Sequence, residues 1–323
     1  MRVCLFFYKS LPFSEGMKKE KEIMKKSIVA RILATITVLM LVTSSASAAA
    51  AHPVFKAENG QLVLVGTMEE TAAKMPVASG TLVKQNARAI IDYSNTTDGY
   101  VMVKFTGTTN TRIKIQIAGP SYSTKKLIYT YDMKVGEWTV FPLTDGNGQY
   151  KVTVLENTSG TKYAQVLTES FQVAMRDQFA PFLQPSQRVS FDKAPNAVAK
   201  AAELIGNETD MDNLKKINKV YNFVASNFSY DHQLAATVKS GYLPVLDNTL
   251  ATQKGICYDY AALMTGMLRS QNVPCKMVFG YVNGEYHAWV NVWNGSEWVR
   301  MDPTINPSAQ FAKTLTYQEV YFF

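Results

Sequence analysis

Three side chains in the last third of the 323-residue chain have the types that can activate a thiol for attack on a carbonyl carbon. They are Cys257 in KGICYDYAALMTGMLRSQ, His287 in EYHAWVNVW and Asp302 in VRMDP. A thiolate is a nucleophile, an imidazole can move the proton, and a carboxylate can hold the imidazole in one tautomer. The chemistry depends on whether folding brings the three together.

Each of these residues also has a plainer explanation. Cys257 could be a packed apolar thiol, or could pair with Cys275 in a disulfide that would abolish a thiol mechanism. His287 could be a structural histidine, and Asp302 could cap the turn at DPT. Asp259, in the first turn after Cys257, opposes a thiolate, so it either caps the helix or lowers the activity.

The element that must carry Cys257 is a helix. Apolar residues recur at helical spacing after it, at Tyr260, Leu263, Met264, Met267 and Leu268. This spacing predicts a buried helix that starts near Cys257. A helix N-terminus favours a thiolate, and the backbone N–H of Cys257 is a candidate donor to an oxyanion.

The elements that must carry His287 and Asp302 are strands. Asn-Gly pairs at 283–284 and 294–295 predict two tight hairpin turns and therefore strands at 276–282, 285–293 and 296–302. If both turns hold two residues, His287 lies directly opposite Asp302, within reach of a hydrogen bond.

The same register assigns the rest of the sheet. The face of His287 also carries Trp289 and Trp298, which we expect to be groove walls or packing residues. Gly280 lies opposite His287 and is expected to leave open space beside the ring. The other face holds residues typical of a core, namely Ala288, Val290, Val292, Val299 and Met301.

Upstream, the pattern changes. Between about residues 60 and 175, segments such as RIKIQIAG and QYKVTVLEN alternate with period two and are separated by turn signals. They predict an antiparallel β-sandwich of immunoglobulin-like type, for binding, spacing or support. The proline-containing segment 179–195 is expected to be a linker or an extended strap. DMDNLKKINKVYNFVASNF predicts a helix capped by Asp210 or Asp212, and residues 229–253 are expected to be loops. Its expected apolar stripe comprises Leu214, Ile217, Val220, Tyr221, Val224 and Phe228.

The first 50 residues have the form of a secretory signal that starts at Met17 or Met24, with an uncleaved anchor as the alternative. They hold eight Lys/Arg and three Asp/Glu. Cleavage would leave 25 basic and 23 acidic residues, so the net charge would fall from +7 to +2. This balance does not argue for a nucleic-acid or membrane partner. The chain is 47% hydrophobic and 18% charged, as in globular proteins.

The stretch from Gly255 to Thr304 resembles the core of the transglutaminase-like superfamily. The resemblance is carried by Gly255-Ile256-Cys257, Leu268-Arg269, Val273-Pro274-Cys275, Gly280-Tyr281, His287-Ala288-Trp289 and Asp302-Pro303-Thr304. It implies an α+β, papain-like fold with helices packed on an antiparallel sheet, and a triad of Cys257, His287 and Asp302. No metal-binding motif is present, so we expect neither a metal nor another cofactor.

We therefore expect a signal peptide at 1–50, a β-sandwich domain at 51–178, a linker at 179–195 and a transglutaminase-like catalytic domain at 196–323. The expected function is a secreted, cysteine-dependent acyl transfer from protein or peptide amides, by hydrolysis or transamidation. The alternative is a non-catalytic binding module at the cell surface. Candidate partners are protein or peptide substrates and cell-surface or cell-wall components, without nucleic acid and without a membrane span after signal cleavage.

Overall fold

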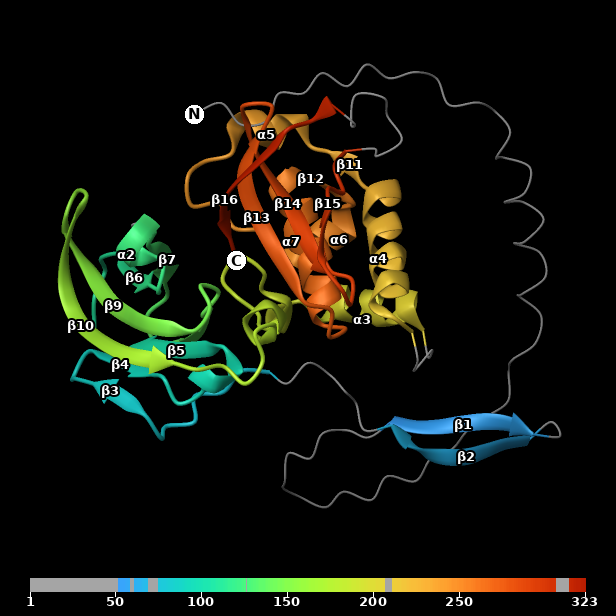
Figure 1. The fold of residues 1–323 in the computed structure, drawn as a ribbon, viewed down its shortest axis with the longest axis horizontal. Helices are drawn as coiled ribbons and strands as arrows, with labels where there is room; N and C mark the ends of the chain where they lie inside the picture. The colour runs from blue at the N-terminus through green and yellow to red at the C-terminus, as the bar shows by residue number, and fades with distance from the viewer. Residues whose placement is uncertain (1–51, 59–60, 69–74, 126, 207–210, 306–313) are drawn as a thin grey trace. The chain divides into compact units, whose positions relative to one another are not determined.

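The computed structural model describes residues 52–58, 61–68, 75–125, 127–206, 211–305 and 314–323, so the expected leader lies outside the described residues. β1 (His52–Glu58) and β2 (Gln61–Met68) form a two-stranded antiparallel sheet of their own (Figure 1). This hairpin belongs to a different unit from the described residues from 75 onward, which form one compact unit.

Two four-stranded antiparallel sheets follow, with strand orders β3-β4-β5-β8 and β10-β9-β6-β7. Their strands are β3 (Val83–Gln85), β4 (Ala89–Asp92), β5 (Tyr100–Phe105), β6 (Ile113–Ala118), β7 (Tyr129–Met133), β8 (Trp138–Pro142), β9 (Gly148–Ser159) and β10 (Lys162–Val173). The alternation in β6 buries Ile113, Ile115 and Ile117. Tyr131 of one sheet meets Phe141 of the other with ring centroids 5.0 Å apart, so the two sheets share a core. Short helical segments η3 (Thr96–Asp98) and α2 (Tyr122–Lys125) lie between the strands.

The segment at 179–195 is a strap with its own short helical turns, η4 (Ala180–Leu183) and η5 (Phe191–Lys193). Val189 is fully buried and Phe191 nearly so, within the same hydrophobic cluster as the residues of the following helices. Of the two alternatives, the burial of these side chains fits an extended strap and not a solvated linker.

Among the described residues, the strap is followed by α3 (Pro195–Ile205), α4 (Asn213–Asn227), α5 (His232–Thr237), α6 (Leu246–Thr252) and α7 (Cys257–Arg269). The expectation of loops at 229–253 was wrong, because α5 and α6 lie there, beside the short parallel pair β11 (Ser229–Tyr230) and β12 (Lys254–Gly255). Both helices are too short to show a clear period. In the described parts of the chain, no helix is long and apolar enough to cross a membrane.

Helix α4 largely follows its predicted pattern. Asp212 caps it by accepting a hydrogen bond from the backbone N–H of Lys215 at 2.8 Å. Ile217, Val220 and Val224 are buried, but Leu214 is 50% exposed, so its expected place in the buried stripe was wrong. At about 100° per residue, Leu214 lies on the flank, about 90° from the direction of the three buried side chains.

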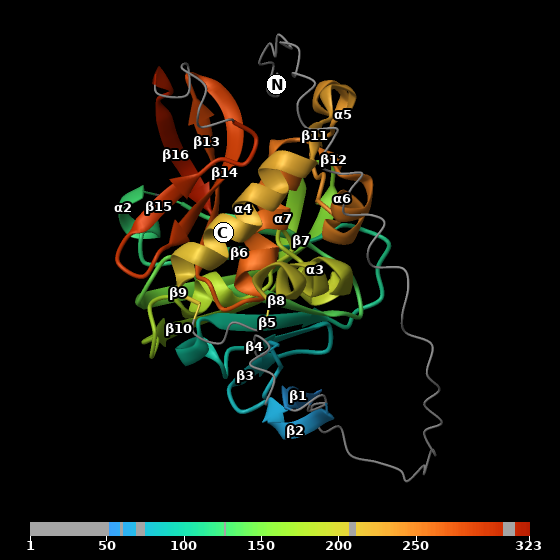
Figure 2. The same ribbon diagram turned by 90° about the vertical axis from the view of Figure 1, so that its right-hand side faces the viewer.

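The second half contains the sheet β15-β14-β13-β16, formed by β13 (Cys275–Val282), β14 (Glu285–Trp293), β15 (Trp298–Met301) and β16 (Tyr317–Phe322). Helix α7 packs on the β13 and β14 strands, against the face that carries Ala288, Val290 and Val292. Helices α3, α4 and α6 pack on α7 from the same side of the sheet (Figure 2). The C-terminal segment supplies β16, which pairs with β13.

The two Asn-Gly hairpins differ. The first is as predicted, with Val282 opposite Glu285 and positive φ at Asn283 and Gly284. The second was predicted wrongly, because its connection holds four residues and Trp293 pairs with Trp298. The side-chain oxygen of Asn294 accepts hydrogen bonds from the backbone N–H groups of Ser296 and Glu297, and these bonds stabilise the longer loop. The two extra loop residues shift the register by two, so each side chain keeps its predicted face.

Candidate active site

Helix α7 begins at Cys257, as the spacing predicted, and Asp259 caps it. One Asp259 oxygen accepts the backbone N–H of Ile256 at 2.8 Å and the other accepts the Tyr242 hydroxyl at 2.6 Å. Burial raises the pKa of Asp259, and these hydrogen bonds partly oppose the rise. A Cβ on Gly255 would lie 2.5 Å from the Cβ of Asp259, so the glycine before the helix makes room for this cap.

The two cysteines of the described chain are not joined in a disulfide. Cys275 is fully buried at the start of β13, and burial raises the pKa of its thiol well above the usual range, which keeps it protonated. Cys257 is 4% exposed and stands at the helix start. Of the two thiols, the one at position 257 has the environment that favours a thiolate.

His287 and Asp302 form a buried pair. Nε2 of His287 lies 2.8 Å from Oδ2 of Asp302, and both side chains are less than a tenth exposed. The pairing was predicted from a two-residue turn, but in the observed register the position directly opposite His287 is that of Thr304. Asp302 reaches the ring from just beyond the end of β15, on the same face.

Asp302 has two further partners. Its Oδ1 accepts the backbone N–H of Thr304 at 3.1 Å and the Thr304 hydroxyl at 2.7 Å, and its Oδ2 accepts the Tyr317 hydroxyl at 3.0 Å. Burial alone would raise the pKa of Asp302, but the charge of His287 and the hydrogen bonds hold it below its usual value. Asp302 is therefore an ionised acceptor for the imidazole, and it also caps the DPT turn.

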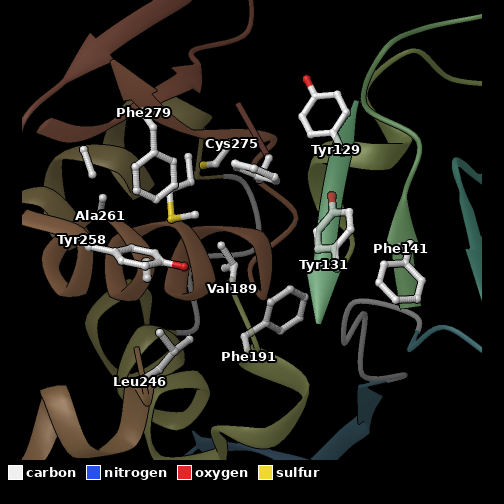
Figure 3. Close-up of a cluster of buried hydrophobic side chains, with 14 of the residues drawn as sticks. Tyr129, Tyr131, Phe141, Val189, Phe191, Leu246, Tyr258, Ala261, Cys275 and Phe279 are labelled. Atoms are coloured by element: carbon white, nitrogen blue, oxygen red, sulfur yellow. The ribbon is translucent and has the colours of Figure 1, made fainter. Parts of the chain in front are cut away.

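Packing places the start of α7 at the end of the sheet that carries His287. The ring of Tyr258 lies edge-on to Phe279 with centroids 4.9 Å apart, and Phe279 pairs with Ala288, the neighbour of His287 (Figure 3). Burial is the largest cause that raises the pKa of Tyr286, and the charge of Cys257 is one of the smaller ones. Cys257 therefore directly precedes a residue whose ring packs one strand away from His287.

The three expected groove residues do not form a groove. Trp289 is fully buried, 6.3 Å from the His287 ring, and packs edge-on to Tyr317. A Cβ on Gly280 would lie 2.0 Å from the carbonyl oxygen of Gln318, so strand β16 fills the space expected to be open. Trp298 pairs with Trp293, six residues and roughly 20 Å along β14 from His287, too far to line its site.

Three contributors to the site were missed from the sequence. Thr304 could have been found, because a threonine two residues after an aspartate is typical of a side-chain-capped turn. Tyr317 gave no local signal, since the pairing of β16 is decided by tertiary contacts. Arg269 was quoted only as part of a motif, yet its buried guanidinium donates to the carbonyl oxygens of Cys275, Gln184 and Phe323 and anchors the end of α7. Burial lowers its pKa to about 10.

Comparison with known proteins identifies this part of the chain. Residues 199–303 match the model of the transglutaminase-like superfamily. YebA of Bacillus subtilis is 30% identical over 131 residues, which cover 33% of this chain and 18% of YebA. A protein-glutamine gamma-glutamyltransferase of Pseudomonas aeruginosa is 33% identical over 92 residues, 24% of this chain and 13% of that protein. The chain spans half or less of the length of the curated relatives it matches.

Among solved structures, the periplasmic domain of TgpA from Pseudomonas aeruginosa bound to ethylmercury is similar at a TM-score of 0.30 and 16% identity. The similarity covers 61% of this chain and 90% of that one. The stretch that matches the superfamily contains α7, β13, β14 and β15, and with them Cys257, His287 and Asp302. Residues 199–303 thus belong to the transglutaminase-like superfamily and have its mixed helix-and-sheet, papain-like fold.

Proposed function

We propose that the chain is a cysteine-dependent acyl-transfer enzyme that attacks protein or peptide amides through a thioester. The observation that carries the proposal is the buried His287–Asp302 hydrogen bond of 2.8 Å, on a sheet packed against the helix that begins at Cys257. In papain-like enzymes of this type, an activated thiol, a base and an orienting carboxylate suffice for the reaction.

In the proposed mechanism, His287 takes the Cys257 proton through Nδ1, because Asp302 engages Nε2. The Sγ–C bond forms, and the backbone N–H of Cys257 donates to the oxyanion. The C–N bond then breaks as His287 protonates the leaving amine. Water or an amine attacks the thioester with His287 as base, releasing an acid or a new amide and restoring the thiol. We favour hydrolysis, because water is available unless the site excludes it.

Three wider features belong to the same proposal. Residues 1–50 would direct secretion, so the enzyme would act outside the cytoplasm. The two sheets between residues 83 and 173 would form an immunoglobulin-like sandwich that supports the catalytic domain. Protein or peptide substrates, with cell-surface or cell-wall components as further candidates, would be the partners.

The test compares two cysteine variants on a mixture of peptide and glutamine substrates. Cys257→Ala should remove all turnover, measured as new amines, ammonia or cross-linked product by mass spectrometry. Cys275→Ala is the matched control, because it removes a thiol that is fully buried and stays protonated. Equal turnover by wild type and Cys257→Ala would show that the thiol does not catalyse the reaction.

A non-catalytic binding module is the second candidate, and the low exposure of Cys257 and His287 favours it. The two candidates differ in thiol reactivity. An activated Cys257 should react with iodoacetamide at neutral pH faster than a simple thiol, because more of it is thiolate. A rate no faster than that of a simple thiol supports the binding module.

A further inference from the structure

The strap places one guanidinium beside the start of α7. Nη1 of Arg188 donates to the Tyr258 hydroxyl at 3.4 Å, and Tyr258 directly follows Cys257. The guanidinium carbon lies 4.4 Å from the Phe323 ring centroid and 5.7 Å from that of Phe279. These aromatic faces hold Arg188 in place without neutralising its charge.

Within the described residues, Arg188 forms no ion pair with a carboxylate, and its buried Nε has no hydrogen-bond partner. The carboxylates of the site are engaged elsewhere, Asp259 by Tyr242 and Ile256, and Asp302 by His287. Because Nε is buried and the side chain as a whole is partly exposed, a ligand would contact Arg188 through its Nη groups. A guanidinium fork matches a carboxylate with two parallel hydrogen bonds, so an anionic ligand is the chemically suited partner.

Tyr286 lies on the strand next to the ring on which Arg188 packs. Burial is the main cause that raises the pKa of Tyr286, the charge of Arg188 opposes the rise, and Tyr321 and Cys257 add to it. Tyr286 precedes His287 on β14 and stacks on Phe279 with centroids 6.1 Å apart. The Arg188 guanidinium lies over Phe279, which pairs with Ala288, the neighbour of His287, and it bonds Tyr258, the neighbour of Cys257.

A hollow of about 420 Å³ adjoins Tyr321. It is lined by Lys125, Leu127, Ile128, Val320 and Tyr321. The Lys125 amine is exposed and forms no ion pair within the described residues. A hollow with apolar walls and an ammonium group has the charge that complements an acidic peptide. Its wall residue Tyr321 pairs with Phe279, the ring over which Arg188 lies.

We propose that Arg188 binds a carboxylate of the acyl donor, so that the enzyme selects acidic peptides with a carboxylate close to the scissile amide. This inference rests on the proposed function, because it assigns the substrate class of that same site. In it, Arg188 determines specificity by holding the anionic group beside Cys257, and the hollow at Tyr321 accepts the flanking part of the peptide.

The test uses two alkylating reagents of the same shape, N-bromoacetyl-γ-aminobutyrate and its neutral primary amide. Alkylation of Cys257 in the full chain is followed by peptide mass spectrometry, and each rate is divided by the rate with N-acetylcysteine amide. We expect the anionic reagent to be favoured about tenfold, the effect of one hydrogen bond to a charged group. Added salt should reduce this preference, because it screens the charges.

Variants assign the preference. Arg188→Gln should bring the ratio of anionic to neutral rates to one, whereas Arg188→Lys should keep part of it. Because Arg188 packs on two rings, the rate with the neutral reagent and the near-UV circular dichroism check that the site remains folded. The ratio of the anionic to the neutral alkylation rate tests the inference, and neither rate alone does.

The possible failures are distinguishable. A ratio of one in the wild type, or an unchanged ratio in Arg188→Gln, overturns the assignment of Arg188 but leaves the proposed function standing. Rates with both reagents no faster than those of a simple thiol contradict the proposed function instead. A preference that survives in Arg188→Gln but disappears in Lys125→Gln moves the anion site to the hollow and likewise overturns the inference.

Discussion

Asp302 shows how one residue can satisfy two interpretations that the sequence set against each other. Its Oδ1 caps the turn through Thr304, and its Oδ2 bonds His287. The two roles use different oxygens, so they do not compete. The cap fixes the carboxylate, and the fixed carboxylate fixes the imidazole.

The depressed pKa of Asp302 predicts a specific acid sensitivity. Burial would raise this pKa, but the charge of His287 and the hydrogen bonds lower it below the unfolded value of about 3.9. Such a group stabilises the fold above the unfolded pKa, and the stabilisation is lost as the pH falls through the folded pKa. As the pH is lowered from about 4, we expect the free energy of unfolding of the wild type to decrease, and that of Asp302→Asn to decrease less. Urea unfolding of both proteins at a series of pH values below about 4 tests this. An equal dependence of the unfolding free energy on pH in the two proteins would contradict it.

Tyr317 is a positioning residue, because it contacts Asp302 and acts on His287 only through that carboxylate. Tyr317→Phe removes one of the donors that favour the ionised form, so the pKa of Asp302 should rise and turnover should fall about fivefold to tenfold. Tyr163→Phe, on β10 and away from the site, is the control. The pH profile of Cys257 alkylation should shift only in the first variant, and a fall in turnover without that shift would indicate a structural role alone.

At the scale of elements, Arg269 anchors the end of α7 to β13, the strap and the C-terminal residue through three carbonyl oxygens. Arg269→Met keeps the length of the side chain but leaves these acceptors without their donor. We expect a loss of about 3–5 kcal/mol in the free energy of unfolding. Arg112→Met, which breaks an exposed ion pair, should cost less than about 1 kcal/mol. Chemical denaturation of both variants measures the contrast.

The second hairpin loop predicts that deleting two of its residues and deleting one will have different effects on the site. Deleting Ser296 and Glu297 together leaves an Asn-Gly turn between Trp293 and Trp298, so the observed pairing and the His287 site should survive. Deleting Ser296 alone should move the following residues by one and turn Asp302 away from His287. Cys257 alkylation should stay fast in the double deletion and become slow in the single one. The reverse order would contradict the register.

At the scale of the molecule, the two sheets of residues 83–173, the strap and the helices and sheet that follow it share one hydrophobic cluster. Phe323 packs edge-on to Tyr129 of β7, with ring centroids 5.4 Å apart, and Arg269 bonds the strap at Gln184. The part from 75 onward should therefore unfold in one transition by calorimetry, and residues 196–323 alone should not fold. Two separate transitions, or a folded fragment 196–323, would show independent domains.

The sequence by itself determined the local features of this protein. Helical spacing located the start of α7 at Cys257, the Asn-Gly signal located both hairpins, and period-two alternation assigned His287 and Asp302 to one face. These features depend on residues close in the chain, whose spacing follows the geometry of helix and strand. The length of the loop at 294–297 was predicted wrongly, because the Asn294 side chain stabilises a longer turn than Asn-Gly alone predicts.

Only the tertiary structure decided what surrounds the pair. The pairing of β16 with β13 closed the space beside Gly280 and brought Tyr317 to Asp302. The docking of α7 on the sheet brought Tyr258, the neighbour of Cys257, against Phe279, and the path of the strap brought Arg188 to Tyr258. These contacts join segments far apart in sequence, and packing selects them from many arrangements that the local patterns allow equally.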